Sequence, residues 1–300
     1  MPFLRSATPV PVHRQSGTPA IRPPRRRSST RLGLATSVAT MAVALIGALA
    51  GCGSSAAAHH AAALPHGDDS QQAGSAASVS PSAAADALLA RIPHFDPAPT
   101  PEPVHVPPGT SAGWYSAIPT TQRVAFLTID DGLVKNPEAI KLVQAAHVPI
   151  TLFLEINAIR DNTDFFRPLQ AAGAVIEAHT ITHMELKGKS YDVQKREICG
   201  SADQLATLYG RRPVLFRPPY GDKDATTLRV VHDCGMTAAL FWKETVNTGT
   251  VRYQVGNQIA PGDIILMHFR PAFVDDFLAA LQAIHDAGLT PALLEDYITT

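Results

Sequence analysis

The chain of 300 residues is 45% hydrophobic and 17% charged, which is enough apolar sequence for a sizeable core and excludes a protein that is disordered throughout. Seven of its 25 basic residues and none of its 26 acidic residues lie in residues 1–51, so the remainder has 18 basic against 26 acidic side chains and offers no basic surface for nucleic acid. Its three cysteines cannot form a disulfide scaffold, and none has the Cys-x-x-Cys spacing of a zinc ribbon or redox motif.

The first 51 residues have the composition of an export signal. Four arginines between residues 25 and 31 precede an uncharged run from Leu32 to Ala50. That run is also long enough for a membrane-spanning helix, so its length alone leaves both interpretations open. Leu49-Ala50-Gly51-Cys52 resembles the lipobox of bacterial lipoproteins. We therefore expect residues 1–51 to be a lipoprotein signal peptide and a lipid on Cys52 to hold the chain outside the cytoplasm, at the cell membrane; a secreted chain or a single-helix anchor is the alternative.

Residues 52–117 have the composition of a tether. Residues 53–112 include 16 Ala, 8 Ser and 9 Pro with only six charged side chains, and they show no sustained period of a helix or strand. The prolines from Pro93 to Pro108 favour extended polyproline conformation. We expect a disordered Ala/Ser/Pro tether that holds the following domain away from the membrane.

From about residue 118 the sequence alternates between short apolar, β-branched runs and segments of helical spacing, which indicates parallel strands with helical crossovers, in an open doubly wound sheet or a barrel. We expect one α/β domain over residues 118–300. The predicted strands are Val124–Ile129, Ile150–Glu155, Ala174–Ala178, Val214–Phe216, Thr237–Trp242, Asp263–Met267 and Thr290–Leu294. The predicted helices are Pro137–Ala146, Phe165–Ala172, Tyr191–Tyr209, Ala225–Asp233 and Ala272–Ala287.

Polar residues stand where four of these strands end, and the carboxyl ends of parallel strands share one face of such a fold. At the first of them, Asp130 and Asp131 are adjacent. One acid at such a turn often caps the next helix, but Asn136 before Pro137 already supplies a cap. The repulsion between the two carboxylates would be relieved by a cation on one and a basic partner on the other.

His179 and His183 follow a second strand, and histidines four residues apart can reach one metal ion. A chance pair at this spacing is not rare among 12 histidines, so its place at a strand end is what favours a site. With Asp131 the two imidazoles form a ligand set that leaves positions open for water and substrate. Non-haem iron oxygenases share this set, and the βα context favours hydrolysis.

Arg217 and His268 end two further strands. Arg217 precedes two prolines, so it is either a solvated residue of a proline turn or the basic partner that holds Asp130. A lone His at the end of a buried strand is often a hydrogen-bonded core residue, whereas on the rim of a metal site it can donate a proton to a leaving group.

Four motifs carry a resemblance to a known family, the polysaccharide deacetylases with a NodB homology domain, or carbohydrate esterase family 4. They are Thr128-Ile129-Asp130-Asp131-Gly132, His179-Thr180-Ile181-Thr182-His183, Arg217-Pro218-Pro219-Tyr220-Gly221 and Leu266-Met267-His268. The resemblance covers about residues 118–300 and implies an α/β fold, a distorted (β/α) barrel of about seven parallel strands. It also implies that Asp131, His179 and His183 hold Zn²⁺ or another divalent cation such as Co²⁺. Asp130 would be the general base and Arg217 would orient it.

The resemblance further implies that His268 is the general acid and that the backbone N–H of Tyr220 stabilises the oxyanion. Trp242 is expected to contact the sugar. The sequence departs from the family where Leu133 replaces a proline and where no Asp-Trp pair follows Trp242. We expect Glu244 to fix the tautomer of His268 in place of that pair, with a role confined to its own loop as the alternative.

The implied activity is metal-dependent removal of N-acetyl groups from amino sugars of peptidoglycan or another surface polysaccharide. The alternatives are an O-acetyl esterase of the xylan type and a lipoprotein that binds cell-wall glycan without turning it over. The expected partners are an acetylated polysaccharide and, through the lipid, the membrane. Finally, Cys199 and Cys234 lie on predicted helices that flank the strand ending at Arg217, and in an oxidising compartment we expect them to form a disulfide.

Overall fold

Residues 81–300 are described by the computed structural model of the chain, so the predicted signal peptide, Cys52 and the first part of the tether lie outside the described residues. The described residues form a sheet that curls into a half-barrel with helices packed around it, which confirms the predicted distorted (β/α) barrel. Its strand order is β2-β7-β6-β5-β4-β3-β10-β8-β9, with β11 also paired to β3. All pairs are parallel except the hairpin of β8 and β9.

The strands are short, and most of them are buried on both faces. Their bounds are β1 Val104–His105, β2 Gly113–Tyr115, β3 Val124–Asp131, β4 Thr151–Leu154, β5 Val175–Ala178, β6 Leu215–Phe216, β7 Ala238–Leu240, β8 Glu244–Asn247, β9 Thr250–Tyr253, β10 Ile264–His268, β11 Thr290–Pro291 and β12 Ile298–Thr299. β1 and β12 form a separate parallel pair. The buried faces of β3, β4 and β10 are apolar, as expected for a parallel sheet covered on both sides.

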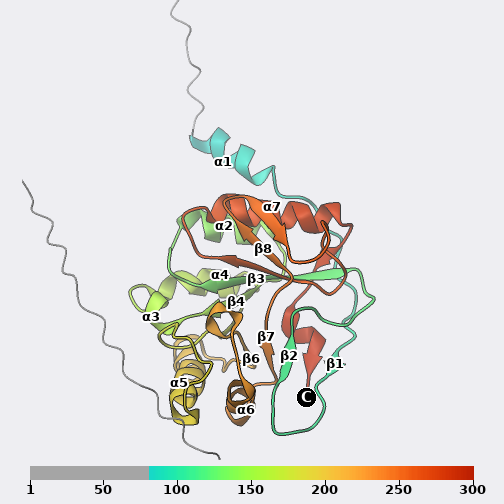
Figure 1. The fold of residues 1–300 in the computed structure, drawn as a ribbon. Coiled ribbons are helices and arrows are strands. Elements are labelled where there is room, and N and C mark those ends of the chain that lie inside the picture. The colour runs from blue at the N-terminus through green and yellow to red at the C-terminus, as the bar shows by residue number, and fades with distance from the viewer. Residues whose placement is uncertain (1–80) are drawn as a thin grey trace, which may run out of the picture. The chain divides into compact units, whose positions relative to one another are not determined.

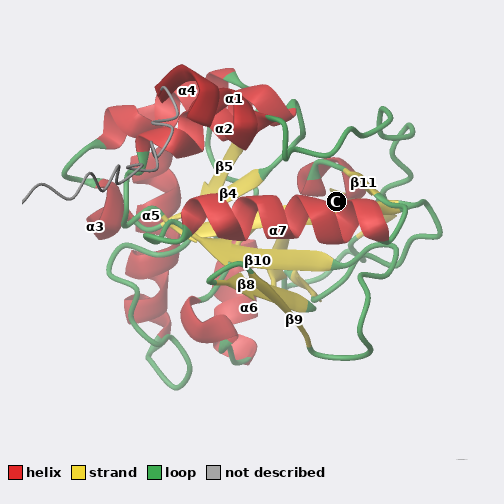
Figure 2. Ribbon diagram, turned by 90° about the horizontal axis from the view of Figure 1, so that it is seen from above, coloured by secondary structure: helices red, strands yellow, loops and turns green. Residues whose placement is uncertain are grey.

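Helices pack around the sheet, and one of them, at residues 81–89, lies outside this layer (Figure 1). They are α1 Pro81–Leu89, α2 Pro137–Ala146, α3 Ile156–Ile159, α4 Arg167–Ala171, α5 Tyr191–Tyr209, α6 Ala225–Asp233 and α7 Phe273–Asp286, with short 3₁₀ turns η1 Thr163–Phe166, η2 Pro219–Gly221 and η3 Leu294–Tyr297. In Figure 1, α2 and α7 lie above the central strands and α5 and α6 lie below them. Figure 2 shows α7 running alongside β10. Among residues 81–300 no helix is both long enough and apolar enough to cross a membrane.

Two apolar clusters fill the domain. The larger one lies between the helices and the outer face of the sheet, and the smaller one lies on the inner face, where Phe126, Phe153 and Tyr297 are buried. Along β3 the side chains alternate between the clusters, because Ala125 and Leu127 belong to the outer one and Phe126 to the inner one.

Three helices begin and end at the predicted residues because their caps are local. Asn136 accepts a hydrogen bond from the N–H of Glu138 at the start of α2, and Ser190 accepts one from Val193 at the start of α5. Gly210, with φ 77°, ends α5 in the left-handed conformation. At α6, Asp224 and Thr227 form a reciprocal capping box.

Part of the predicted tether is folded. Residues 104–117, which the sequence assigned to it, contribute β1, which pairs with β12, and β2, which extends the main sheet beside β7. Ile92 and Phe95 also pack against the core. The expectation of disorder was wrong here, because a few apolar side chains among the prolines suffice to dock an extended segment on a sheet edge.

The hairpin of β8 and β9 is a second difference from the prediction, which placed no strand between residues 242 and 263. Its two-residue turn has Thr248 at φ 52° and Gly249 at φ 69°, the left-handed pair that a tight hairpin requires. The N–H of Gly249 donates to Asp276 on α7 at 2.7 Å and so fixes the turn to that helix.

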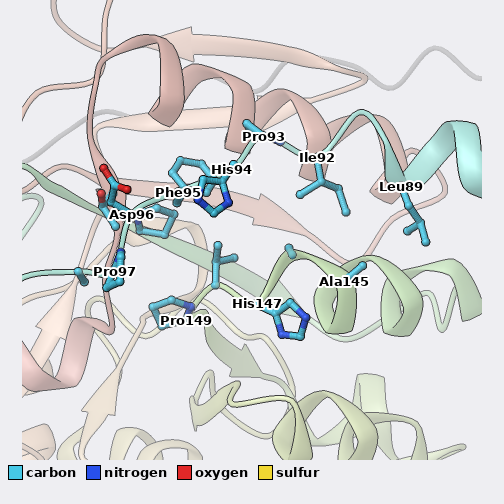
Figure 3. Close-up of a pocket in the computed structure, with 15 residues that line it drawn as sticks. Leu89, Ile92, Pro93, His94, Phe95, Asp96, Pro97, Ala145, His147 and Pro149 are labelled. Carbon is cyan, nitrogen blue, oxygen red and sulfur yellow. The ribbon is translucent and has the colours of Figure 1, made fainter.

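A cavity of about 510 Å³ lies at the opposite end of the sheet from the strand ends that carry the polar motifs. The segment from Ile92 to Ala98 forms one wall, and the end of α2 with Val148 and Pro149 forms another. Figure 3 shows side chains of both walls, including Phe95 and His147, around this space. The residues of the candidate site described below do not line it.

Candidate metal centre and active site

The four polar motifs converge on one edge of the sheet. Asp130 and His268 are register partners on the adjacent strands β3 and β10. Asp131 on β3 is the register partner of Leu154 on β4, and Leu154 is the register partner of Ala178 on β5. Ala178 ends β5, and His179 follows it directly. The backbone N–H of Arg217 donates to the carbonyl of Ala178. Parallel strand ends therefore bring all the predicted catalytic and ligand residues together.

Asp131, His179 and His183 form a group whose ligand atoms all lie within 4.8 Å of one another. Asp131 Oδ1 lies 3.5 Å from Nε2 of His179 and 3.4 Å from Nε2 of His183. Ligand atoms at about 2.0–2.1 Å around a tetrahedral metal ion are about 3.3 Å apart, so the spacing fits a divalent cation.

Two further observations fit a metal ion in this group. Asp131 Oδ1 is buried and has no hydrogen-bond partner, although buried carboxylate oxygens are ordinarily satisfied. Nδ1 of His179 lies 2.7 Å from the carbonyl oxygen of Arg217, to which it donates when Nε2 is unprotonated. A carbonyl partner of this kind orients a metal-binding imidazole, and it leaves the Nε2 lone pair directed at Asp131.

The charges of the group favour the ionised carboxylate. Burial raises the pKa of Asp131, but the neighbouring imidazoles of His179 and His183, which favour the ionised carboxylate when they carry a proton, outweigh it and hold this pKa well below its usual range. Burial lowers the pKa of His179, and the carboxylates of Asp130 and Asp131 outweigh that and raise it. The raised pKa of His179 means that the two carboxylates favour a positive charge beside them, which a bound cation would also supply.

Backbone strain is concentrated at this edge. Among the described residues other than glycine, six have positive φ, and four of these belong to the motifs: Asp131 at 72°, Thr180 at 68°, His183 at 55° and Tyr220 at 62°. Each such conformation costs roughly 1–3 kcal/mol and persists only where the surroundings impose it. The fold therefore imposes strained backbone conformations where the four motifs meet.

Asp130 is held by Arg217 as predicted, and both side chains are buried. Nη1 of Arg217 donates to Asp130 Oδ1 at 2.7 Å and to Oγ1 of Thr128 at 2.8 Å. The guanidinium also lies 4.3 Å above the ring of Phe153. Burial lowers the pKa of Arg217, and the charge and hydrogen bond of Asp130 oppose this. Arg217 is therefore a fixed cation inside the half-barrel, not a solvated turn residue.

His268 lies at the rim beside Asp130. Burial lowers the pKa of its imidazole, while the charges of Asp130 and Asp131 oppose that change. The expectation that Glu244 would fix the tautomer of His268 is wrong. Glu244 is level with Ile265, three residues before His268 on β10, and burial together with the nearby carboxyl group of Asp263 raises its pKa. The strand after Trp242 that the sequence did not predict thus places Glu244 near Asp263, immediately before β10, whereas His268 lies at the end of β10.

Tyr220 and Trp242 flank the centre. The ring of Tyr220 is 67% exposed and lies 4.9 Å from that of His183. The Trp242 ring stacks on Phe241 with centroids 4.1 Å apart and lies 5.9 Å from the Arg217 guanidinium. Gly221 packs on this aromatic pair, since a Cβ atom there would come within 2.1 Å of the Phe241 ring. The loop that carries Tyr220 therefore rests directly on Phe241 and Trp242.

Two residues near the site have roles that the sequence did not predict. Thr128 is fully buried, accepts from Arg217, and donates to the carbonyl of Ile265 at 2.6 Å. Glu197 on α5 accepts from two N–H groups of the segment between His179 and His183. In the sequence, Glu197 stands out only as an acid next to the apolar Ile198 in a predicted helix. That position does not indicate that it binds the backbone of the His179–His183 segment.

The structure joins Cys199 of α5 to Cys234, the residue that ends α6, by a disulfide with a Cα–Cα distance of 5.2 Å. This is the pair that the sequence predicted. The bond connects the helix that carries Glu197 to the helix that follows the Tyr220 loop.

Comparison with known proteins agrees with this geometry. A family model described as polysaccharide deacetylase matches residues 117–239. An uncharacterized protein of Streptomyces coelicolor is 35% identical over 185 residues, covering 60% of this chain and 74% of that protein. A peptidoglycan-N-acetylglucosamine deacetylase of Bacillus cereus is 27% identical over 161 residues, or 51% of this chain and 58% of that enzyme.

Among solved structures, a family 4 carbohydrate esterase from Bacillus anthracis has a TM-score of 0.53 at 19% identity, covering 62% of this chain and 86% of that one. At this identity the likeness concerns the fold. Together with the four motifs, these matches define a polysaccharide deacetylase domain of the NodB homology type. The chain belongs to the polysaccharide deacetylases, and its fold is that of family 4 carbohydrate esterases.

Proposed function

We propose that the chain is a metal-dependent hydrolase that removes N-acetyl groups from the amino sugars of peptidoglycan or another surface polysaccharide. One observation carries this proposal: three kinds of group share one edge of the sheet. They are the ligand group of Asp131, His179 and His183, the carboxylate of Asp130 held by Arg217, and the imidazole of His268. A base, a cation site and an acid at one edge meet the needs of amide hydrolysis. The similarity to a peptidoglycan-N-acetylglucosamine deacetylase supports the substrate class.

A divalent ion such as Zn²⁺ or Co²⁺ held by Asp131, His179 and His183 would supply Lewis acidity toward a carbonyl oxygen and toward water. Asp130 would take the proton from the attacking water. Its Oδ1 already accepts from Arg217, and its Oδ2 faces the ligand group at 3.8 Å from Nε2 of His179. Arg217 keeps the Asp130 carboxylate in this orientation.

His268 would donate a proton to the departing amine nitrogen, which is a poor leaving group unless protonated. Its place beside Asp130 in the strand register puts the acid and the base next to each other. The backbone N–H of Tyr220, held at φ 62°, would donate to the oxyanion that forms on the acetyl carbonyl. The exposed Tyr220 ring and Trp242 offer faces on which a sugar ring can stack.

Cys52, which lies outside the described residues, would carry a lipid, and residues 53 to about 91 would link it to the domain. This part of the proposal rests on Leu49-Ala50-Gly51-Cys52 after the apolar run. A lipid-anchored enzyme would reach only glycans near the membrane surface.

Acetate release from defined substrates tests the proposed function. The purified chain, stripped of metal and then loaded with Zn²⁺, is given chitooligosaccharides, peptidoglycan and acetylxylan. We expect acetate from one of the N-acetylated glycans only when metal is present. Release from acetylxylan alone would indicate an O-acetyl esterase. Binding to peptidoglycan without any acetate release would indicate a glycan-binding lipoprotein.

A further inference from the structure

The segment that carries the two ligand histidines is held by a side chain from outside it. Oε2 of Glu197, on α5, accepts a hydrogen bond from the backbone N–H of Ile181 at 3.0 Å and a second from Thr182 at 2.9 Å. Glu197 is only 8% exposed, so water competes little for these bonds. One carboxylate oxygen thus binds the two peptide groups that lie between His179 and His183.

Those two peptide groups lie between the strained positions of the segment. Thr180 and His183 both have left-handed backbones, with φ of 68° and 55°. The N–H of His183 also donates to Oγ1 of Thr180 at 3.0 Å. The residues between them are unstrained but must turn the chain so that both imidazoles face Asp131. A backbone of this shape needs acceptors that enforce it, and Glu197 supplies the only side-chain acceptor for Ile181 and Thr182 among the described contacts.

The position of Glu197 is itself fixed. It lies in the middle of a 19-residue helix, two residues before Cys199, whose disulfide ties the helix to the end of α6. Gly200, about one turn after Glu197 on α5, also lies close to the segment. A Cβ atom added to Gly200 would lie 3.0 Å from Cδ1 of Ile181. The acceptor is therefore presented by a rigid element in direct contact with the metal-binding segment.

We infer that Glu197 is a positioning residue that sets the geometry of the metal-binding segment and thereby its affinity for a divalent cation. The inference rests on the proposed metal site. It adds a residue that touches neither metal nor substrate and acts through the peptide groups of Ile181 and Thr182. Partners of this kind typically change metal affinity by about 10–100-fold when removed.

The test measures metal binding directly, without turnover. The metal-free full chain is titrated with Co²⁺ while its visible absorption is followed, and Zn²⁺ affinity is obtained by competition. In Glu197→Ala we expect the dissociation constants to rise by about 10–100-fold and the Co²⁺ spectrum to change, because the imidazoles lose their fixed geometry. Glu197→Gln keeps an acceptor oxygen without the charge, so its affinity should lie between those of Glu197→Ala and the wild type.

Glu185→Gln is the matched control, because Glu185 is an exposed acid two residues after His183 with no hydrogen bond to the segment. We expect its dissociation constants to stay within about twofold of wild type. Melting temperatures of the metal-free variants separate a loss of folding from a loss of geometry. Wild-type affinity and spectrum in both folded Glu197 variants would overturn the inference and leave the deacetylase proposal intact. A wild-type chain that binds neither ion would overturn the metal site and the inference with it.

Discussion

At the scale of single residues, the adjacent acids Asp130 and Asp131 have separate environments. Asp130 is buried against Arg217 inside the half-barrel. Asp131 has φ 72°, which turns its carboxylate toward the two imidazoles. The left-handed backbone at Asp131 therefore lets two adjacent carboxylates face different partners. Asp130 binds the Arg217 guanidinium, and Asp131 faces the candidate cation site.

This separation gives a prediction for Asp130→Asn. The amide cannot take a proton from water, so we expect acetate release to fall by about 10²–10⁴-fold. Bound metal, measured by elemental analysis, should remain at about one ion per chain because the ligand set is untouched. Asp164→Asn, which changes an exposed acid paired only with Arg167, is the control and should keep full activity. An undiminished rate in Asp130→Asn would mean that another group activates the water.

Glu244 gives a second prediction, which concerns stability. Burial, together with the nearby carboxyl group of Asp263, raises the pKa of Glu244 from its ordinary value of 4.5 to about 8. The folded chain therefore retains a proton that the unfolded chain loses between about pH 4.5 and 8, and the free energy of unfolding should fall as pH rises through this window. Each pKa unit of difference corresponds to about 1.4 kcal/mol, so the loss amounts to a few kcal/mol.

Glu244→Gln should remove that loss, because its amide is neutral and does not titrate in this pH range. The measurement is the melting temperature of both chains from pH 5 to pH 9. We expect the wild type to lose stability toward pH 9 and the variant to lose much less. Parallel curves would show that Glu244 is not the group that titrates.

At the scale of elements, the sequence predicts best where the signal is local. The bounds of α2, α5 and α6 were predicted correctly because Asn136, Ser190 and Asp224 cap them. β8 and β9 were missed because Glu244 begins a strand with an acid, which normally marks a loop. Its burial depends on Asp263, which lies 19 residues away in the sequence. Long-range partners of this kind are invisible to local pattern.

The same contrast holds at the candidate site. The strand-end positions of the ligands, of Asp130 and of His268 follow from the alternation of strands and helices, so their convergence was predictable. The link from Glu197 to the His179–His183 segment was not, because it depends on how α5 packs across β5. Local signals thus identified the residues that line the rim but not those that hold them in place.

The disulfide between α5 and α6 gives an element-scale prediction. It closes a loop between residues 35 apart in sequence, so replacing both cysteines by serine should cost about 2–4 kcal/mol. For a domain of this size that lowers the melting temperature by about 5–15 °C. Calorimetry of the wild type and of the Cys199→Ser/Cys234→Ser variant checks it. Both chains melting at the same temperature in the absence of reductant would show that the bond adds no stability.

At the scale of the whole molecule, the proposed lipid on Cys52 would determine where the proposed deacetylase works. We expect the native chain to fractionate with membranes and Cys52→Ala to lose its lipid modification. Mass spectrometry of the mature N-terminus checks this directly. A native chain that begins upstream of residue 52, or that carries an unmodified Cys52, would contradict the assignment.

The boundary of the folded domain is the second property of the whole molecule. The composition put it at residue 118, but β1 pairs with β12 and β2 covers the edge of β7. Ile92, Phe95 and Trp114 also pack on the core, and the segment from Ile92 to Ala98 walls the cavity beside α2.

A chain that begins at residue 118 should therefore be less stable than one that begins at residue 81. It loses the two strand pairings and exposes apolar surface, and each large apolar side chain contributes about 1.5–3 kcal/mol when fully buried. With partial burial of three such side chains, the loss is a few kcal/mol, or a fall of about 10 °C in melting temperature. The open edge of β7 should also make the shorter chain prone to aggregation, because unpaired strand edges recruit other chains. Calorimetry and light scattering of fragments 81–300 and 118–300 measure both effects. If the 118–300 fragment were monomeric and as stable as the longer one, residues 81–117 would contribute nothing to the folded domain and would belong to the tether.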